Sequence, residues 1–507
     1  MCGKGLGRLP PCRNQKRCAL NQILVKTRLG RHIFGLFQAV IPNFVFACTI
    51  GAFSNLSTQS QLPMLWKNRD VSNPNQAVFF FAQGKYRYLG LVYADDSTQV
   101  WAGINEKGFA IINSNSANIG PGANSGPSDG EIMKYALQNC ASIEDFQHFL
   151  DSTNLVGRKT PANFGVIDST GEATIFEAGA YQYQRFDATK ESLGFLLRAN
   201  YSMSGDSTQR SGHPRYLRAM QLAQIGQSQG ILNAQYIIQK IARDLGGPDF
   251  DPYPLPFCDT FGSYPFGFLP TTATINRYRT RACVLIVGQP KMPMMWTILG
   301  EPCIGIAIPL FLNAFAVPPQ ISGPGLPKIC AQAKTMRELV YMGTDLGINT
   351  FLLAAIQKQT LPLENQIFSL SQAQLEDWLN HLPGSLAVLS FEESLAQRVC
   401  EVYENIGWGE EKSFPIFHSN ILVAPILTTT TNGLKIIIRE KITNENLPIR
   451  FKVYNIFGQK KAEITLPAQT QSYFWLPEKL SSGTYFLILE PNHQIVAKFH
   501  YLSENRD

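Results

Sequence analysis

The chain has 507 residues, of which 45% are hydrophobic and 16% are charged. This composition argues against long disorder, and the length exceeds what one hydrophobic core organises, so we expect two or more domains. The formal net charge of +6 belongs to the first 47 residues, which hold eight Lys or Arg and no Asp or Glu. Subtracting those eight leaves −2, and such a near-neutral remainder gives no indication of nucleic-acid binding.

Residues 1–47 have the features of a secretory leader. Basic residues precede the apolar run 33–41, which is too short and too interrupted to cross a bilayer as a helix. The small residue Ala47, directly before Cys48, predicts cleavage between the two. Cleavage there would give Cys48 a free α-amine beside its thiol, and that amine can serve as the thiol's base.

Two features of the leader allow other interpretations. Residues 1–24 are long, polar and cysteine-bearing for a leader, so we expect translation to start further in, near Val25. The run Val45–Cys48 can also be read as a lipoprotein box that acylates the cysteine, although Phe46 fits such a box poorly.

After Cys48 the pattern predicts short strands, with two helices near residues 128–156. One helix begins after Ser128, and the next is capped by Ser142 with Asp145 three residues on. Further helices are expected at 214–225 and 234–244. The expected strands are 76–83, 86–93, 100–104, 109–113, 163–167, 173–177, 195–199, 282–288 and 294–299.

The C-terminal third changes character twice. Residues 303–328 are rich in proline, and 331–407 have helical periodicity. Strands expected at 433–439, 449–454, 462–466, 472–476 and 484–489 predict a small all-β module behind the joint Thr428–Thr431. We therefore expect a leader (1–47), a main domain (48–330), a helical extension (331–420) and a β-sandwich (428–507).

No cofactor or metal motif is present. The chain lacks a P-loop and a GxGxxG sequence, and its seven histidines form no HxxxH pair. Six cysteines remain besides Cys48 and the leader, with no CxxC spacing, and they allow either disulfides or buried thiols. They are Cys140, Cys258, Cys283, Cys303, Cys330 and Cys400.

An N-terminal thiol that attacks an amide needs its amine held in place, an oxyanion site, and a nearby cation that favours the thiolate. Polar residues that suit these tasks occur in order along the chain. Some end predicted strands, and one opens a predicted helix. They are Lys67, Arg69, Asp70, Asn113, Asn115, Asn200 and Arg215.

This ordered set resembles the N-terminal nucleophile (Ntn) hydrolases of the choloylglycine hydrolase and penicillin V acylase group, with the related acyltransferases that act on linear amides. The nucleophile pair of that group is matched by Cys48-Thr49, and Arg-Asn-x-Asp by Lys67-Asn68-Arg69-Asp70. The turn Asn105-Glu106-Lys107-Gly108 with Asn115, the pair Ala199-Asn200, and Ser211-Gly212-His213-Pro214-Arg215-Tyr216 match further motifs. The similarity covers about residues 48–310.

The resemblance implies an α+β fold, the αββα four-layer sandwich, with the helical extension and an Ig-like β-sandwich added. It implies Cys48 as nucleophile and base, Asp70 orienting the amine, Asn115 and Asn200 lining the oxyanion site, and Arg215 tuning the thiol. It also implies a small N-acyl amide substrate and no cofactor.

The sequence departs from the pattern of that group in two places. Lys67 stands where the group has Arg, and a lysine is a point charge rather than a planar fork. Arg69 is the candidate to supply the guanidinium that is missing at position 67. We expect only one of Lys67 and Arg69 to face the thiol. The motif before Arg215 has one residue more than the family pattern, with three residues between Ser211 and the arginine.

The tail resembles the C-terminal sorting domain read by the type IX secretion system. Three spaced blocks carry the resemblance: residues 453–460, 480–486 and Lys498-Phe499. It implies export through the periplasm to the cell surface or the medium, with the secretion machinery as partner. A plain Ig-like accessory domain is the alternative.

Three other interpretations stay open. His213 can be considered as a base for Cys48, in the manner of papain-like peptidases, although no papain-type signature surrounds the cysteine. The aromatic stretch 254–270 suits either an acyl pocket or ordinary packing. A surface-displayed binding protein without activity would keep the same fold. We expect an exported amidohydrolase that cleaves linear amides through a Cys48 thioester, or an acyltransferase that uses the same thioester.

The first testable prediction concerns the mature N-terminus. Mass spectrometry of the mature protein is expected to find Cys48 as the first residue, with its α-amine unmodified. A start at another residue, or an acylated Cys48, would remove the amine base and contradict the expected mechanism.

Overall fold

The computed structural model describes residues 48–406, except 324 and 342–346, and, between 421 and 501, seven strands with parts of their connections. The leader and the expected cleavage site therefore lie outside the described residues. The chain divides into one unit at 1–44 and another at 45–507.

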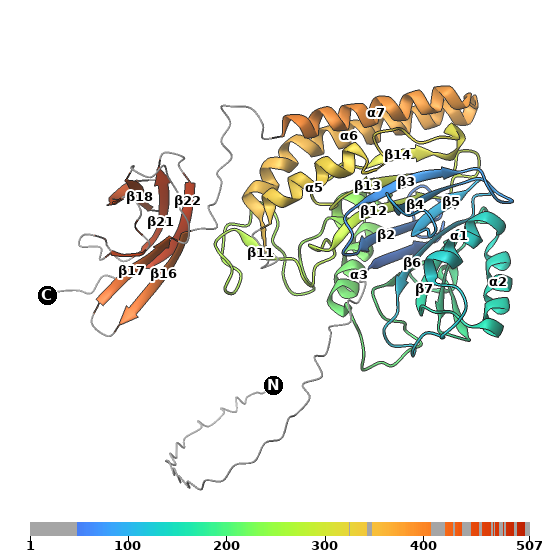
Figure 1. Cartoon of the computed structure of the whole chain (residues 1–507), viewed down its shortest axis with the longest axis horizontal. Helices are drawn as coiled ribbons and strands as arrows, with labels where there is room; N and C mark the ends of the chain where they lie inside the picture. The colour runs from blue at the N-terminus through green and yellow to red at the C-terminus, as the bar shows by residue number, and fades with distance from the viewer. Residues whose placement is uncertain are drawn as a thin grey trace, which may run out of the picture. The chain divides into compact units, whose positions relative to one another are not determined.

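Two antiparallel sheets lie face to face in the main domain (Figure 1). The first has the strand order β10-β1-β2-β12-β13-β14, and the second runs β3 to β9 in chain order. The first sheet consists of β1 (Thr49–Phe53), β2 (Met64–Asp70), β10 (Phe195–Arg198), β12 (Thr280–Val287), β13 (Met294–Leu299) and β14 (Ile308–Phe311). The second consists of β3 (Gln76–Phe81), β4 (Tyr88–Tyr93), β5 (Ala102–Asn105), β6 (Ala110–Asn115), β7 (Ala162–Ile167), β8 (Ala173–Ala178) and β9 (Tyr183–Asp187).

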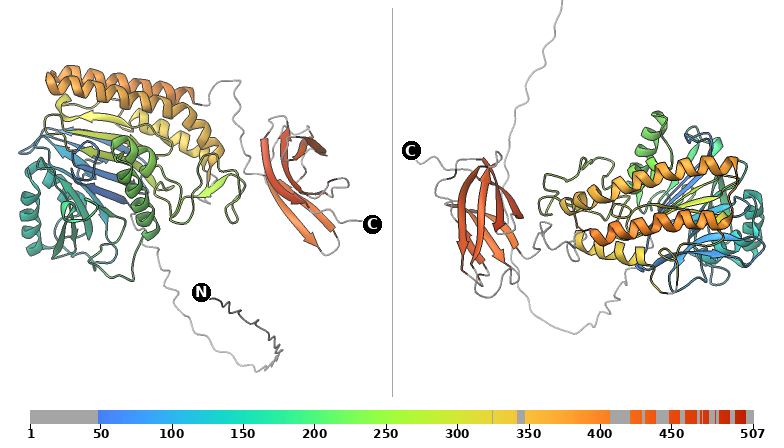
Figure 2. Two further views of the ribbon diagram at one scale, coloured as in Figure 1. Left: turned by 180° about the vertical axis from the view of Figure 1, so that it is seen from behind. Right: turned by 90° about the horizontal axis from the view of Figure 1, so that it is seen from above.

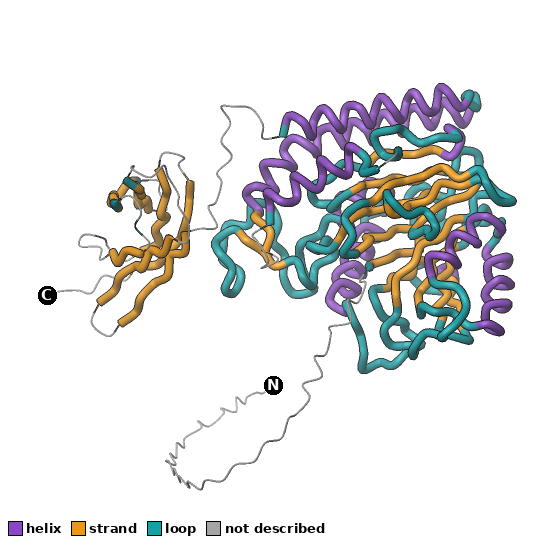
Figure 3. The backbone as a smooth tube through the Cα atoms, viewed as in Figure 1, coloured by secondary structure: helices purple, strands orange, loops and turns teal. Residues whose placement is uncertain are grey.

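Helices cover the outer face of each sheet, as the ribbon views and the tube in Figure 3 show. The seven-stranded sheet carries α1 (Asp129–Asn139) and α2 (Ile143–Val156), which pack on it through their own hydrophobic cluster. The six-stranded sheet carries α3 (His213–Ser228) and the later helices (Figure 2). The order helix, sheet, sheet, helix is the four-layer arrangement expected for the main domain.

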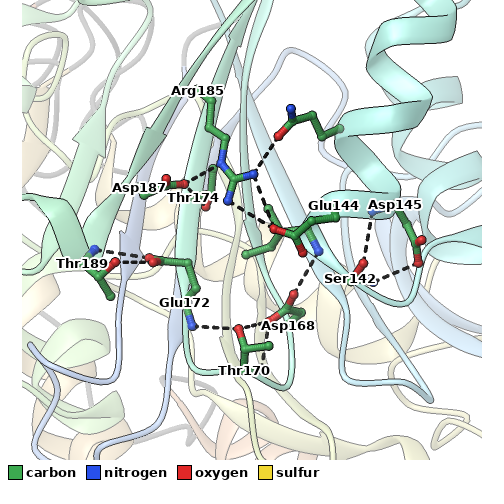
Figure 4. Close-up of polar contacts among 12 residues, drawn as sticks. Ser142, Glu144, Asp145, Asp168, Thr170, Glu172, Thr174, Arg185, Asp187 and Thr189 are labelled. Atoms are coloured by element: carbon green, nitrogen blue, oxygen red, sulfur yellow. Dashed lines mark hydrogen bonds and ion pairs between the residues drawn. The ribbon is translucent and has the colours of Figure 1, made fainter.

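Local signals explain the position of the first two helices. Ser128 and Ser142 each close a capping box, with Glu131 and Asp145 as the reciprocal partners. Figure 4 shows how α2 is fastened to the sheet, where Arg185 of β9 contacts Glu144 of α2 and donates a 2.6 Å bond to Asp187. Both helix starts are as the sequence predicts.

The expected helix 234–244 is correct only in part. Its first turn is α4 (Ala234–Tyr236), and it continues as a π-helix, η2 (Ile237–Ala242). The backbone carbonyl of Ala242 accepts a 2.8 Å bond from Asn68 of β2, which fixes this helix on the first sheet.

The helical extension is a layer of three helices, α5 (Lys328–Val340), α6 (Thr350–Asn380) and α7 (Ser385–Asn405). The helical periodicity predicted at 331–407 is confirmed for these three helices, but Gly347–Asn349 form a strand, β15, and residues 342–346 lie outside the described part. Trp296 of β13 stacks on Phe368 of α6, and Phe311 of β14 contacts Trp378 edge to face. The extension therefore packs on the six-stranded sheet as part of the outer helical layer (Figure 2).

The prediction missed a strand in the proline-rich stretch. Residues Ile308–Phe311 form β14, in which Pro309 lies opposite Trp296. A proline is tolerated there because β14 is the edge strand, where one side needs no ladder donor. A short pair, β11 (Phe268–Pro270) with β15 (Gly347–Asn349), was also missed.

The C-terminal part is an all-β module, described here by itself. One sheet has the order β16-β17-β20 and the other β19-β18-β21-β22. The strands are β16 (Ile421–Thr428), β17 (Thr431–Ile438), β18 (Ile449–Asn455), β19 (Lys460–Leu466), β20 (Ser472–Trp475), β21 (Gly483–Glu490) and β22 (Gln494–Tyr501). Thr428 pairs with Thr431, so the expected joint links two strands of the module and is no boundary.

The seven cysteines of the described part, from Cys48 to Cys400, are all free thiols, and of these Cys258 is exposed. Among the residues that the structure describes, no helix is long and apolar enough to span a membrane.

A buried ion pair fastens α6 to the main domain. Glu364 accepts a 2.5 Å bond from Arg243 and a 2.7 Å bond from the backbone N–H of Ala307. Glu364→Ala leaves the Arg243 charge buried without its counter-ion, which is expected to cost about 3–5 kcal/mol of unfolding free energy. Urea unfolding of the full chain, followed by tryptophan fluorescence, measures this.

The matched control is Glu376→Ala, which removes an exposed carboxylate from the same helix. It is expected to change the unfolding free energy by less than about 0.5 kcal/mol. Equal effects of the two substitutions would show that the ion pair does not fasten α6.

Candidate active site

Four strand ends meet around Cys48 because neighbouring strands run antiparallel. Cys48 directly precedes β1, and Thr49 lies opposite Asn68, near the C-terminal end of β2. Asn200 follows β10, which pairs with the other side of β1. The end of β6 contributes Asn115 from the facing sheet, which contacts β1 and β2. Cys48 itself is buried, with 4% of its surface exposed.

Arg215 joins these strand ends through one buried guanidinium. Its Nη1 donates a 2.8 Å bond to the backbone carbonyl of Cys48 and a 2.7 Å bond to Thr49 Oγ1. Its Nη2 donates a 2.7 Å bond to Asn200 Oδ1. The sequence prediction placed Arg215 at the thiol despite the inserted residue, and the structure brings it to the backbone of that cysteine.

The start of α3 is built to present this arginine. Arg215 is the third residue of the helix, after Gly212 as N-cap and Pro214 in the first turn. Gly212 has φ +79°, and a Cβ there would lie 2.2 Å from Arg215 Nη2. Position 212 therefore requires glycine, because its backbone is left-handed and because a side chain there would take the space of the Arg215 guanidinium.

Asp70 is buried and shares Arg215 with the strand ends. Its Oδ1 accepts a 2.7 Å bond from Thr280, and its Oδ2 lies 3.3 Å from Arg277 Nη1 and 3.9 Å from Arg215 Nη1. Burial raises the pKa of this carboxyl, and the positive charges of Arg277 and Arg215 act in the opposite direction. Asp70 thus lies beside the group that holds the Cys48 carbonyl.

Lys67 lies in a polar chain between the two sheets. Its Nζ donates to Asn113 Oδ1 and, at 2.7 Å, to the backbone carbonyl of Trp101. Asn113 in turn donates a 2.6 Å bond to Asp129, the first residue of α1. Burial lowers the pKa of Lys67 to about 8, while the nearby Cys48 and Asp129 act to raise it.

Arg69 occupies the same face as Lys67. Its guanidinium lies 4.1 Å from the ring centre of Trp101 and 4.8 Å from that of Tyr93, and its Nε donates a 3.0 Å bond to Gln76. Burial lowers the pKa of Arg69, and Cys48 counteracts this.

The expectation that only one of Lys67 and Arg69 can face the thiol was therefore wrong. Residues two apart on a strand share a face, because side chains alternate with a period of two. Both cations point between the sheets and both interact electrostatically with Cys48. Asn68 and Asp70 point to the opposite face, toward η2 and α3.

The two predicted oxyanion residues are adjacent. Asn200 Nδ2 donates a 3.1 Å bond to the backbone carbonyl of Asn115. Asn200 is fully buried and Asn115 is half-buried. The amide of Asn200 is thus oriented from both ends, by Arg215 and by Asn115.

His213, considered above as an alternative base for Cys48, contacts a tyrosine hydroxyl. His213 Nδ1 lies 3.0 Å from the hydroxyl of Tyr201, and its ring stacks on Tyr216. Within the aromatic stretch, Phe257 and Phe261 contact Phe250 edge to face.

Four residues of this site had no role in the prediction from sequence. Asn113 was considered together with Asn115 but was given no role. The signal for it was the spacing of two residues between them, which puts both side chains on one face of the strand. Asp129 follows the N-cap serine of α1 and so had a positional signal, but Arg277 and Thr280 had none, because only the pairing of β12 with β2 brings them to Asp70.

The family described as "AAT: Acyl-coenzyme A:6-aminopenicillanic acid acyl-transferase" matches residues 57–238. This segment resembles that acyltransferase family. It begins nine residues after Cys48 and contains the other candidate residues, from Lys67 to Arg215. No curated protein sequence matches the chain.

Similar solved structures include a mutant of the conjugated bile acid hydrolase from Clostridium perfringens, with 14% identity and a TM-score of 0.35. The match covers 92% of that protein's length and 52% of this chain. Penicillin V acylase from Agrobacterium tumefaciens is 15% identical to this chain, with a TM-score of 0.35. The match covers 86% of that protein's length and 52% of this chain.

Lys67 generates a prediction about stability and pH. Its pKa is about 8 in the folded protein against a normal value of 10.5, so between these values the unfolded chain binds more protons. Unfolding free energy must then rise with pH in this window, by about 3 kcal/mol in total from this residue. We expect the difference between wild type and Lys67→Met, measured by urea unfolding, to rise from pH 8 to pH 10.5. A difference that stays flat or falls would contradict the assignment.

Proposed function

We propose that the chain is an N-terminal-cysteine amidase that cleaves linear amide bonds of N-acyl substrates. Removal of the leader after Ala47 makes Cys48 the first residue. Its sulfur attacks the amide carbonyl, and its α-amine takes the thiol proton and gives it to the departing amine. The S–C bond forms, the C–N bond breaks, and water then hydrolyses the thioester to a carboxylic acid and the thiol.

The arrangement of Arg215 is the observation that carries this proposal. One guanidinium holds the Cys48 carbonyl, the Thr49 hydroxyl and the Asn200 amide, and it lies 3.9 Å from Asp70. These contacts fix the backbone on which the new N-terminus would lie. In this proposal Asp70 holds the ammonium form of the amine, and its distance of 3.9 Å from Arg215, which binds the Cys48 carbonyl, supports that role.

The remaining side chains suit the charge that develops in the reaction. Lys67 and Arg69 supply two buried positive charges that interact electrostatically with Cys48. Negative charge on the sulfur and on the carbonyl oxygen is stabilised by such charges in a site of low dielectric constant. Asn115 and Asn200 are the proposed oxyanion residues.

Acyl transfer is the second candidate function. The matched family is described as an acyl-transferase, and its match includes the proposed oxyanion residues. The chemistry differs only in the acceptor, since an amine instead of water would attack the thioester. Product analysis with and without an added amine distinguishes the two reactions.

We further propose that the protein is exported and that its C-terminal module is a type IX sorting signal. The basic and apolar leader and the three tail blocks support this. The Ig-like assignment of the module also belongs to this proposal, supported by two sheets of short antiparallel strands.

The decisive experiment compares three forms on a panel of N-acyl amides. Cys48→Ala in the mature protein is expected to lower kcat/KM by at least about a thousand-fold, since the nucleophile is lost. A precursor with a blocked cleavage site is expected to be equally inactive, because its amine stays in a peptide bond. The matched control, Cys400→Ala, removes a buried thiol of α7, outside the candidate site, and should keep kcat/KM.

Unchanged activity of Cys48→Ala would exclude this site. An active precursor would exclude the amine as base. A wild-type protein that binds these amides without cleaving them would favour a binding protein that retains the fold.

A further inference from the structure

A buried carboxylate lies two hydrogen bonds away from the ammonium of Lys67. Asp129 is the first residue of α1 and is 6% exposed, and its Oδ2 accepts a 2.6 Å bond from Asn113 Nδ2. Burial raises the pKa of this carboxyl, while the charge of Lys67 and the backbone N–H of Gly130, at the start of the helix, act in the opposite direction. The reaction proposed above gives this acid no role.

Asn113 fixes the direction of the connection between Asp129 and Lys67. An ammonium can only donate hydrogen bonds and a carboxylate can only accept them, so the amide must turn Oδ1 to the lysine and Nδ2 to the acid. The backbone carbonyl of Trp101 is a second acceptor, 2.7 Å from the same Nζ. Two of the three ammonium protons therefore have acceptors, and the third has none among the residues that the structure describes. That proton is left for the sulfur of Cys48 or for the substrate.

The surrounding charges explain why Lys67 needs an anion. Burial lowers the pKa of Lys67 to about 8, and the guanidinium of Arg69 acts in the same direction. Three groups oppose this effect: Cys48, Asp129 and Asp70. Asp70, however, points to the other face of β2, where it is paired with two arginines. Asp129 is therefore the carboxylate available to Lys67 on the side of β2 that faces the second sheet.

We propose that Asp129 is a positioning residue for the reaction proposed above, and that through Asn113 it holds the ammonium of Lys67 toward Cys48. This role of Asp129 rests on the proposed function. Asp129 acts through the other two residues rather than on the reacting atoms, because it gives the amide one orientation and the lysine one charge state. Without the carboxylate, the cations Lys67 and Arg69 are buried side by side, and the lysine is the one that can release its proton.

The test is the pH profile of kcat/KM of the mature full chain, on the N-acyl amide that it cleaves fastest. Lys67→Arg identifies the alkaline limb that belongs to Lys67, since a guanidinium stays charged and the limb is expected to move to higher pH. Asp129→Asn keeps the shape of the acid and removes its charge, so that Lys67 loses its proton more easily. Its alkaline limb is expected to lie about one pH unit or more below that of the wild type, which lowers kcat/KM at pH 9 about ten-fold.

Further variants separate an action through Lys67 from a general defect. In the Lys67→Arg background, Asp129→Asn is expected to leave the alkaline limb in place, because arginine does not titrate in this range. The matched control, Glu144→Gln, removes a carboxylate from the first turn of α2 whose side chain is 61% exposed, and should leave the profile unchanged. If Asp129→Asn does not fold, Asn113→Ala replaces it, and its limb must also move to lower pH because the ammonium loses an acceptor.

Failure of the proposed function and failure of this role give different results. A wild type that is inert on every amide of the panel excludes the proposed function, and the role of Asp129 with it. With an active wild type, the role alone is excluded if Asp129→Asn lowers kcat/KM equally at every pH, as a structural defect would. It is also excluded if Lys67→Arg leaves the alkaline limb in place, or if Asp129→Asn moves the limb equally in both backgrounds. If Lys67→Arg is inactive, the limb of Asp129→Asn decides alone.

Discussion

The buried guanidinium of Arg215 is the constraint on which the proposed site depends. It connects the end of β10, the start of β1 and the first turn of α3, and it lies within ion-pair distance of Asp70 at the end of β2. Removing an arginine from water is costly, and here the planar fork recovers that cost through three oxygen acceptors at once. A lysine could not replace it, because an ammonium cannot span these acceptors with the same geometry. Gly212 keeps the space that the guanidinium occupies.

Strand alternation divides the charges around Cys48 between two faces of the same sheet. Lys67 and Arg69 point between the sheets. There Lys67 donates hydrogen bonds to Asn113 and to the backbone of Trp101, and Arg69 lies against the rings of Trp101 and Tyr93. Asp70 points outward to Arg215 and Arg277. Cys48 lies where the two sets meet: Lys67, Arg69 and Arg215 all interact electrostatically with it, and Arg215 also binds its backbone carbonyl. A lysine at position 67 fits this arrangement, since Asn113 and Asp129 form a polar chain that suits a single ammonium.

The helical extension does more than cover the sheet. Its ion pair between Glu364 and Arg243 fixes α6 against η2, and η2 is bonded through Ala242 to Asn68, next to the cations of β2. A cavity of about 920 Å³ lies at this junction. It is bounded by the same helix, α3, that carries Arg215 at its start.

The sequence by itself determined the local elements and the order of the polar residues. The capping serines predicted the starts of α1 and α2, the alternating strands predicted most of both sheets, and the motif spacing selected Cys48, Asp70, Asn200 and Arg215, because these signals depend on neighbours in the chain. Only the tertiary structure decided what lies across strands and layers. The pairing of β12 with β2 brought Thr280 to Asp70, the facing sheet brought Asn113 to Lys67, and edge position allowed Pro309 in a strand. The physical reason is that such contacts join residues far apart in the chain, and no local pattern records which surfaces meet.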